Sequence, residues 1–184
     1  EKLSLLEIDP EPLASARLGQ VHRATRRSDG LQIALKIQYP GVDKAIDQDL
    51  KAMKSIFAMA QWIPKGPDFD EVFKEIRMML HLEVDYEKEL LQTKIFKKAF
   101  GDLPGVVVPE VFEEFSTARV LATSFESGVA VDSPEVKALS QERRNKLGET
   151  FLHVYFRELF LVRQMQTDPH FGNYRVRLGD TDQL

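Results

Sequence analysis

Residues 166–173 read Gln-Thr-Asp-Pro-His-Phe-Gly-Asn, and this polar stretch constrains the fold more than any other part of the sequence. Asp168 and Asn173 lie in it with four residues between them, after an apolar segment with helical spacing and before the strand pattern of residues 174–178. One loop of this kind can place a carboxylate at an attacking group and an amide oxygen on Mg²⁺. Taken alone, the same pattern is compatible with a turn held by an Asx cap.

The segment before this loop is predicted to be a long helix over residues 141–165. Its apolar residues fall on more than one face, which predicts burial on more than one side. These residues are Leu147, Phe151, Leu152, Tyr155, Phe156, Leu159, Phe160 and Val162. The sequence contains no run of about 18 uncharged apolar residues, so no transmembrane span is predicted. No signal peptide is recognised either.

The N-terminal half has the pattern of a small sheet followed by helices. Residues 8–12 and Ser28-Asp29-Gly30 carry turn signals, and Pro40-Gly41 ends the second strand pattern. The predicted strands cover residues 19–27, 31–38, 106–115 and 119–125, and the predicted helices cover 42–62 and 68–100, the second with a bend. Asp68 with Glu71 resembles a capping box at the start of that second helix. This order predicts an α+β fold with a sheet-based lobe and a helical lobe.

A run of small residues precedes the first strong strand: Ala14-Ser15-Ala16-Arg17-Leu18-Gly19-Gln20-Val21. A loop that covers phosphates needs small side chains so that its backbone N–H groups can approach the phosphate oxygens. The run has the spacing of the kinase motif G-x-G-x-x-G-x-V, with alanine in the first two glycine places. A generic turn of small residues is the alternative.

Two further segments carry charges that suit nucleotide binding. Ile33-Ala34-Leu35-Lys36 matches the kinase V-A-I-K strand, whose lysine holds the α- and β-phosphates. Glu89, with Glu83 and Asp85 before it, lies in the predicted helix 68–100 and can pair with Lys36. Glu83 and Glu89 would be roughly 240° apart on one helix, so they should have separate roles. The alternative is a solvated charged face.

Composition excludes several other classes of protein. The chain has 184 residues with 25 Lys+Arg and 29 Asp+Glu, so the net charge is 25 − 29 = −4, which gives no reason to expect nucleic acid as a partner. Cysteine is absent, which excludes disulfides and cysteine-based zinc sites. The four histidines show no metal-ligand spacing, and we expect none of them to bind metal.

Together these segments resemble the UbiB/AarF/ADCK family of atypical protein-kinase-like proteins. The resemblance spans nearly the whole sequence and rests on a combination of motifs. ASARLGQVHRA (residues 14–24) resembles the family's alanine-rich loop, and ALKIQYPGV (34–42) resembles its AVKVQYPGV stretch. EVDY (83–86) with Glu89 resembles the ExDY…E helix, and STARVL (116–121) the strand before the hinge. RELF (157–160) and MQTDPHFGN (165–173) resemble RELF…DPHPGN.

The resemblance implies a two-lobed kinase-like fold that binds ATP or ADP with Mg²⁺ and supports ubiquinone (coenzyme Q) biosynthesis as an atypical kinase or ATPase. By analogy, residues 1–126 form the N-lobe and 127–184 the start of a C-lobe. Asp168 and Lys36 would be catalytic, Asn173 a Mg²⁺ ligand, and Glu83 and Asp85 the regulatory ExD motif. Nucleotide would be bound by Ala14, Ser15, Ala16, Arg17, Gly19, Val21, Ala34, Lys36, Glu89, Ser124 and Phe125.

The family also suggests partners and a location. Membrane lipid and proteins of ubiquinone biosynthesis are the expected partners, in the cytoplasm or the mitochondrial matrix, at the periphery of the inner membrane. Three positions depart from the family pattern: Arg17 replaces a usual Ser, Phe171 a Pro, and Gln92 an Asn.

Two family elements, the KxGQ segment and the DFG-like Asp, do not occur within residues 1–184, so we expect the sequence to be part of a longer chain. We also expect residues 1–184 alone to hydrolyse ATP poorly. A catalytically weak pseudokinase module that acts as a scaffold or regulator is one alternative interpretation, and an unrelated α+β interaction domain is another.

Overall fold

The computed structural model describes residues 2–15, 18–60, 68–164 and 171–184. The chain divides into two compact units. The first unit consists of Glu1–Leu91 with Val111–Ser124, and the second of Gln92–Glu110 with Phe125–Leu184. The predicted lobe boundary at residue 126 stays a prediction.

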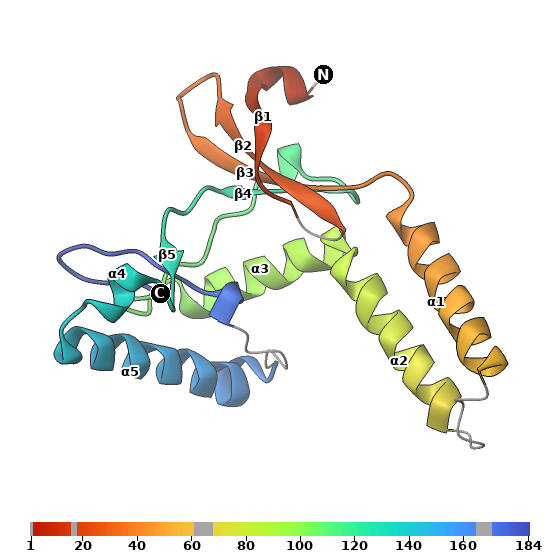
Figure 1. Cartoon of the computed structure of the whole chain (residues 1–184). Helices are drawn as coiled ribbons and strands as arrows, with labels where there is room; N and C mark the ends of the chain where they lie inside the picture. Colours follow the sequence, from red (N-terminus) through yellow and green to blue (C-terminus); the bar gives the residue numbers. More distant parts are fainter. Residues whose placement is uncertain (1, 16–17, 61–67, 165–170) are drawn as a thin grey trace. The chain divides into compact units, whose positions relative to one another are not determined.

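The first unit is built on a four-stranded antiparallel sheet (Figure 1). A 3₁₀ turn, Lys2–Leu5, leads into strand β1 (Leu6–Ser15), and the strand order is the chain order. The other strands are β2 (Gly19–Arg26), β3 (Gln32–Gln38) and β4 (Val120–Ser124). The predicted hairpin of β2 and β3 is confirmed, and Gly30 supplies the positive φ (75°) that its turn requires.

Strand β1 was not expected, because its two prolines were interpreted as a turn signal. Pro10 and Pro12 lie inside the strand, and the register with β2 shifts on either side of Pro12. Proline is tolerated here because β1 is the edge strand, where one backbone N–H can face solvent. The turn predicted at residues 8–12 is therefore wrong.

Alternation along β3 separates the core of the first unit from its site-bearing face. Ile33 and Leu35 are fully buried, whereas Ala34 and Lys36 point to the opposite side of the sheet. The core cluster joins β3 to its neighbouring strands and to the 3₁₀ turn Glu113–Phe115. Its buried members are Leu6, Ala24, Ile33, Leu35, Phe112, Phe115 and Ala122.

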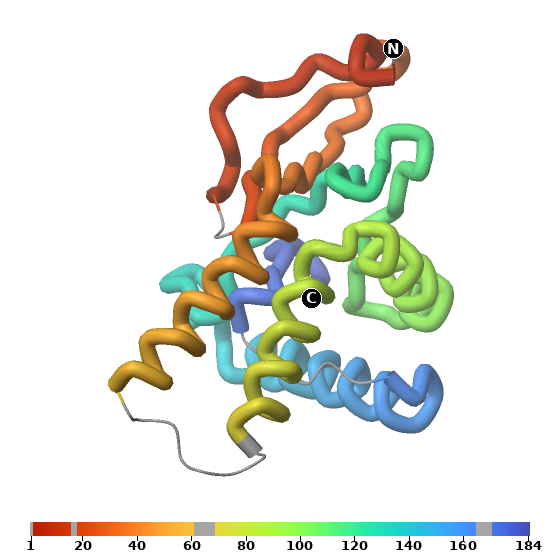
Figure 2. Tube along the Cα trace, turned by 90° about the vertical axis from the view of Figure 1, so that its right-hand side faces the viewer, coloured from red at the N-terminus to blue at the C-terminus, as the bar shows by residue number. Residues whose placement is uncertain are grey.

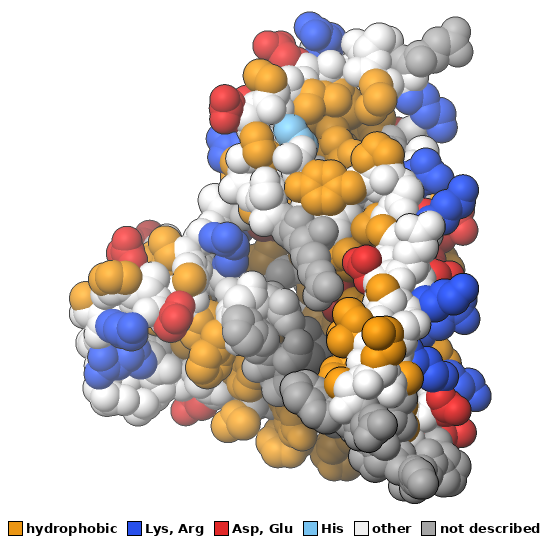
Figure 3. Space-filling model, turned by 45° about the vertical axis from the view of Figure 1, so that its right-hand side comes forward, with side chains coloured by type: hydrophobic (Ala, Val, Ile, Leu, Met, Phe, Trp, Pro, Cys, Tyr) orange, Lys and Arg blue, Asp and Glu red, His pale blue; other side chains and the backbone are white. Residues whose placement is uncertain are grey.

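Two helices follow β3 and pack as an antiparallel hairpin (Figure 2). Helix α1 (Val42–Met59) and helix α2 (Asp68–Glu83) are joined by edge-to-face contacts of the Phe57 ring with the Phe69 and Phe73 rings. Ion pairs add to the contact on the solvent side, and Figure 3 shows charged side chains along the right-hand edge of the hairpin. The helix predicted to reach Trp62 ends at Met59, and Trp62 lies outside the described residues.

The predicted helix 68–100 is two helices. Helix α2 ends at Glu83 and helix α3 (Tyr86–Phe100) begins after a break at residues 84–85. Asp85 causes the restart, because its carboxylate accepts a hydrogen bond from the Lys88 backbone N–H (2.9 Å). The predicted bend is therefore a break with a new N-cap.

The described part of the second unit contains the rest of α3, two further α-helices and a two-stranded sheet. Helix α4 (Pro134–Lys137) is capped by the Ser133 hydroxyl and has proline at its first position, where the missing N–H costs no helical hydrogen bond. Strands β5 (Val129–Ala130) and β6 (Arg175–Val176) pair with each other, so only two residues of the strand predicted at 174–178 form a ladder. The strand predicted over residues 106–115 is wrong: only Val111 forms an isolated bridge, with Thr123.

The backbone of residues 106–108 finds hydrogen-bond partners outside a sheet, although its apolar sequence pattern is typical of a strand. The Val107 N–H donates to the Leu184 carbonyl (2.8 Å), and the Lys97 ammonium donates to the Val108 carbonyl (2.6 Å). Both partners lie in the second unit.

Helix α5 (Gln141–Arg157) is shorter than predicted. A π-helical turn, Glu158–Val162, extends it, and Arg163 then adopts a left-handed conformation with φ 56°. The predicted burial on more than one side is wrong for the described chain: Val154 is buried, but Leu152, Phe156 and Phe160 are exposed. Within the described residues, no helix is long and apolar enough to cross a membrane.

Candidate functional site

Lys36 lies on the face of the sheet that points away from the core. The register places Val21 of β2 and Leu121 of β4 directly opposite it, and Ala34 lies two residues earlier on the same face. Ala14 pairs with Val21, so the last part of β1 contributes to the same face. Four of the residues predicted to bind nucleotide therefore share one surface in the first unit.

Lys36 and Glu89 form the ion pair that the sequence predicts. The Lys36 ammonium donates to both carboxylate oxygens of Glu89, at 2.7 Å to Oε2 and 2.9 Å to Oε1. Each side chain is 38% exposed, so the pair is reachable from solvent. Two charge-assisted hydrogen bonds fix the direction in which the ammonium points, and the described residues offer no further hydrogen-bond acceptor to its third N–H donor.

Tyr86 lies against the same ammonium. The Lys36 Nζ is 4.8 Å from the centre of the Tyr86 ring, within the range of a cation–π contact. The ring is buried, and burial together with the nearby Glu89 charge raises the pKa of Tyr86 to about 12. The phenol is therefore neutral at physiological pH.

Glu83 and Asp85, predicted as a regulatory motif, lie at the junction of α2 and α3. Glu83 is the last residue of α2 and is exposed, whereas Asp85 is the N-cap of α3, the helix that carries Glu89. Glu83 and Glu89 are thus on different helices, and the angle argued for one continuous helix does not apply. Gln38 holds the junction to the sheet, because its side-chain amide donates to the Val84 carbonyl.

The small-residue loop is described on both sides of its centre. Ala14 and Ser15 end β1 and are exposed, while Gly19 begins β2 and is buried. A Cβ at Gly19 would lie 2.3 Å from the Ile37 carbonyl oxygen, so strand packing alone demands glycine there. Ala16 and Arg17 lie outside the described residues.

The remaining predicted residues are described only in part. Ser124 ends β4 in the first unit and Phe125 begins the second unit's segment. Asn173 ends an exposed 3₁₀ turn, Phe171–Asn173, in the second unit. Asp168 lies outside the described residues. Among the residues that are described, no three of His, Asp and Glu gather as a metal-binding set.

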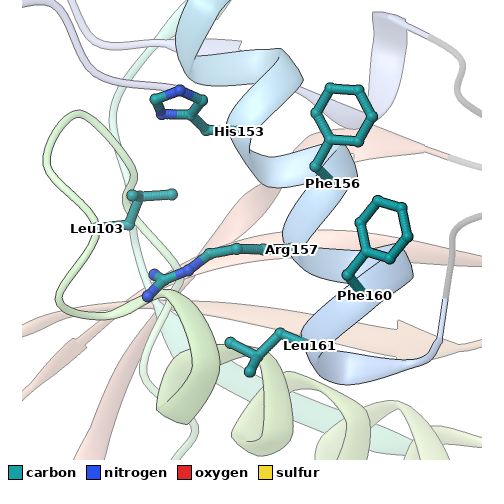
Figure 4. Close-up of a pocket in the computed structure, with 6 residues that line it drawn as sticks. All are labelled: Leu103, His153, Phe156, Arg157, Phe160 and Leu161. Atoms are coloured by element: carbon teal, nitrogen blue, oxygen red, sulfur yellow. The ribbon is translucent and has the colours of Figure 1, made fainter.

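The second unit contains a separate cavity of about 400 Å³ (Figure 4). Its lining is mostly apolar and includes the Phe156 and Phe160 rings, which stack 6.2 Å apart on successive turns. Arg157 also lines it, and its guanidinium donates to the Ala99 carbonyl (3.2 Å) and to Asp102 (3.3 Å). Of the predicted nucleotide-binding residues that the structure describes, none lines this cavity.

Sequence reasoning missed two contributors to the site, Tyr86 and Gln38. Tyr86 precedes Glu89 by three residues, and positions three apart on a helix share a face, so this spacing is a signal that could have identified it. Gln38 follows Lys36 by two residues and therefore shares its face of β3. Its contact with the Val84 carbonyl depends on the break between α2 and α3, whose position could not be predicted from the sequence.

Comparison with known proteins places the chain among atypical kinase-like proteins. Residues 2–183 match the ABC1 atypical kinase-like domain. The mitochondrial atypical kinase COQ8B of Rattus norvegicus is 36% identical over 167 residues, which is 91% of this chain and 31% of that protein. The mitochondrial atypical kinase COQ8 of Saccharomyces cerevisiae is 32% identical over 173 residues, 94% of this chain and 34% of that protein.

A plant relative and a solved structure extend the comparison. The chloroplastic protein Activity of BC1 complex kinase 8 of Arabidopsis thaliana is 34% identical over 175 residues, 91% of this chain and 22% of that protein. The structure of Rv3197 with erythromycin, from Mycobacterium tuberculosis, superposes with a TM-score of 0.73 at 32% identity. The superposition covers 92% of this chain and 42% of the Rv3197 chain. The chain thus spans about a third or less of the curated relatives' length.

Proposed function

The chain belongs to the ABC1 atypical kinase-like family. We propose that it binds Mg-ATP or Mg-ADP and is part of an atypical kinase or ATPase that transfers phosphoryl groups or hydrolyses ATP. The fold is α+β and kinase-like. Family membership removes the interpretation of the chain as an unrelated α+β interaction domain.

The observation that carries the proposal is the Lys36–Glu89 pair. A lysine on a strand, fixed by a helical glutamate, is the arrangement that holds nucleotide phosphates in kinases. Here the lysine is half-exposed on a face that also carries Ala14, Val21 and Ala34, whose side chains are small or branched. Lys36 would hold phosphate oxygens with its third N–H, and Glu89 would keep the ammonium in place.

The chemistry of transfer is proposed for the loop of residues 166–173. Asp168 would accept the proton of the attacking group, and the Asn173 amide oxygen would bind Mg²⁺, which would neutralise charge on the phosphates. Ser124 and Phe125 would supply backbone groups to the adenine. These assignments rest on the spacing of the motif and on the family.

The biological setting is proposed from the resemblance to the UbiB/AarF/ADCK family. Ubiquinone biosynthesis at a membrane is the process we propose, with membrane lipid or proteins of that process as partners. The relatives named mitochondrial support a mitochondrial location, while the chloroplastic relative shows that the domain also occurs in another organelle.

Thermal unfolding of the full-length protein with Mg-ATP and Mg-ADP tests this function. A ligand at about 100 times its dissociation constant stabilises the folded state by roughly 2.7 kcal/mol. We expect this shift in the wild type, a smaller shift in Lys36→Ala, and loss of ATP hydrolysis in Asp168→Asn. A shift without any hydrolysis in the wild type would favour a nucleotide-binding module, and absence of a shift would overturn the proposal.

A further inference from the structure

The Lys36 ammonium is held by two side chains from one face of α3. Tyr86 and Glu89 are three residues apart in this helix, so their side chains are neighbours on its surface. Glu89 accepts two of the three N–H donors of Lys36, while the Tyr86 ring lies 4.8 Å from the nitrogen. A ring face attracts a cation without accepting a directed hydrogen bond, so the contact does not occupy the third donor.

Tyr86 is the most tightly packed of the three residues. As a whole residue it is 2% exposed, whereas the side chains of Lys36 and Glu89 are each 38% exposed, so packing restrains its ring most. Its position at the first residue of α3 places it next to the Asp85 cap and the Gln38 contact, which fasten the start of the helix. The packed Tyr86 ring therefore limits the positions that the Lys36 side chain can adopt when the Glu89 carboxylate moves.

We propose that Tyr86 is a positioning residue that holds the Lys36 ammonium in the place where it meets nucleotide phosphates. The inference rests on the proposed nucleotide binding. A Tyr86 side chain that only filled the core would affect stability, whereas a positioning Tyr86 also affects the recognition of phosphates. The raised pKa of Tyr86 agrees with this role, because a neutral ring presents only its π face to the ammonium.

The test compares Mg-ATP with adenosine as ligands of the full-length protein, since only ATP has phosphates for Lys36. Replacing Tyr86 by leucine removes the ring face, and we expect ATP to bind about five-fold more weakly, as for loss of one partly exposed cation–π contact. Adenosine binding should change less than two-fold, roughly, because Lys36 does not contribute to it. In a Lys36→Met background, Tyr86→Leu should cause no further loss of ATP affinity.

Three controls separate positioning from packing. Tyr86→Phe keeps the ring and should restore the preference for ATP over adenosine. Tyr86→pentafluorophenylalanine keeps the shape of the ring but removes its negative face, so it should weaken ATP binding as predicted for Tyr86→Leu. It also provides the test if the leucine variant does not fold. Phe100→Leu alters another buried aromatic residue of α3, at the opposite end of the helix from Tyr86, and should leave the preference unchanged.

The outcomes distinguish this inference from the function on which it rests. A wild-type protein that binds ATP no better than adenosine would overturn the proposed phosphate contact and the inference with it. A wild-type preference for ATP that survives both Tyr86→Leu and the fluorinated ring would overturn the role of Tyr86 alone. Equal weakening of ATP and adenosine would show a packing role and would also refute positioning.

Discussion

Replacing Gly19 with alanine should destabilise the protein through strand packing, whether or not nucleotide is bound. The added Cβ would lie 2.3 Å from the Ile37 carbonyl oxygen and 3.1 Å from its carbon, so β2 and β3 must separate. Overpacking of this kind costs about 3 kcal/mol at the upper end of its range. Lower entropy of the unfolded chain offsets about 1 kcal/mol, which leaves a net loss of about 2 kcal/mol.

Thermal and urea unfolding without ligand measure this loss. For a chain of this size we expect the melting temperature to fall by about 4–8 °C. Gly148→Ala is the matched control: it lies within α5 with no atom near the added Cβ, so it should gain about 0.5–1 kcal/mol. If Gly19→Ala were as stable as the wild type and lost only nucleotide affinity, glycine would be needed for phosphate approach alone and the packing argument would be refuted.

Three further changes test the local arguments by urea unfolding. Asp85→Ala removes the N-cap of α3 and should lower the free energy of unfolding by about 1 kcal/mol. Asp85→Asn can still cap the helix and should keep most of the stability. Equal losses in the two variants would contradict a capping role. Leu35→Ala empties a fully buried position and should cost about 3 kcal/mol, while Ile56→Ala at an exposed position should change stability by less than about 0.5 kcal/mol. The Arg26 guanidinium beside Asp29 lowers the pKa of that carboxyl to about 2 from 3.8, so its stabilising contribution is present above pH 3.8 and is lost as the pH falls toward 2. Unfolding free energy should therefore fall more steeply over this pH interval in the wild type than in Asp29→Asn, and parallel pH profiles would count against the pair.

Elements with strong local signals were predictable from the sequence. The β2–β3 hairpin follows from alternation around a Ser-Asp-Gly turn, and the pairing of Lys36 with Glu89 follows from the two motifs. Strand β1 was missed because proline is a turn signal in isolation, and only its place at the sheet edge makes Pro10 and Pro12 compatible with a strand.

Other failures share a physical cause, which is that tertiary partners decide the outcome. The apolar run at residues 106–108 resembles a strand, but its backbone bonds to Leu184 and Lys97 instead of a ladder. The apolar faces of α5 predicted burial, yet Phe156 and Phe160 are exposed in the described chain. Tyr86 belongs to the EVDY motif, but the motif does not predict its role, because its contact with Lys36 requires the fold of the first unit.

The most direct test of nucleotide binding at Lys36 is a calorimetric titration of Mg-ATP into the full-length protein, its Lys36→Met variant and its Lys54→Met variant. Lys54 pairs with Asp70 in the α1–α2 hairpin, so its replacement removes a lysine charge without touching the sheet. The account predicts that wild type and Lys54→Met bind ATP alike, and that Lys36→Met binds at least about ten-fold more weakly, a change of about 1.4 kcal/mol. Equal affinities in all three proteins would contradict it.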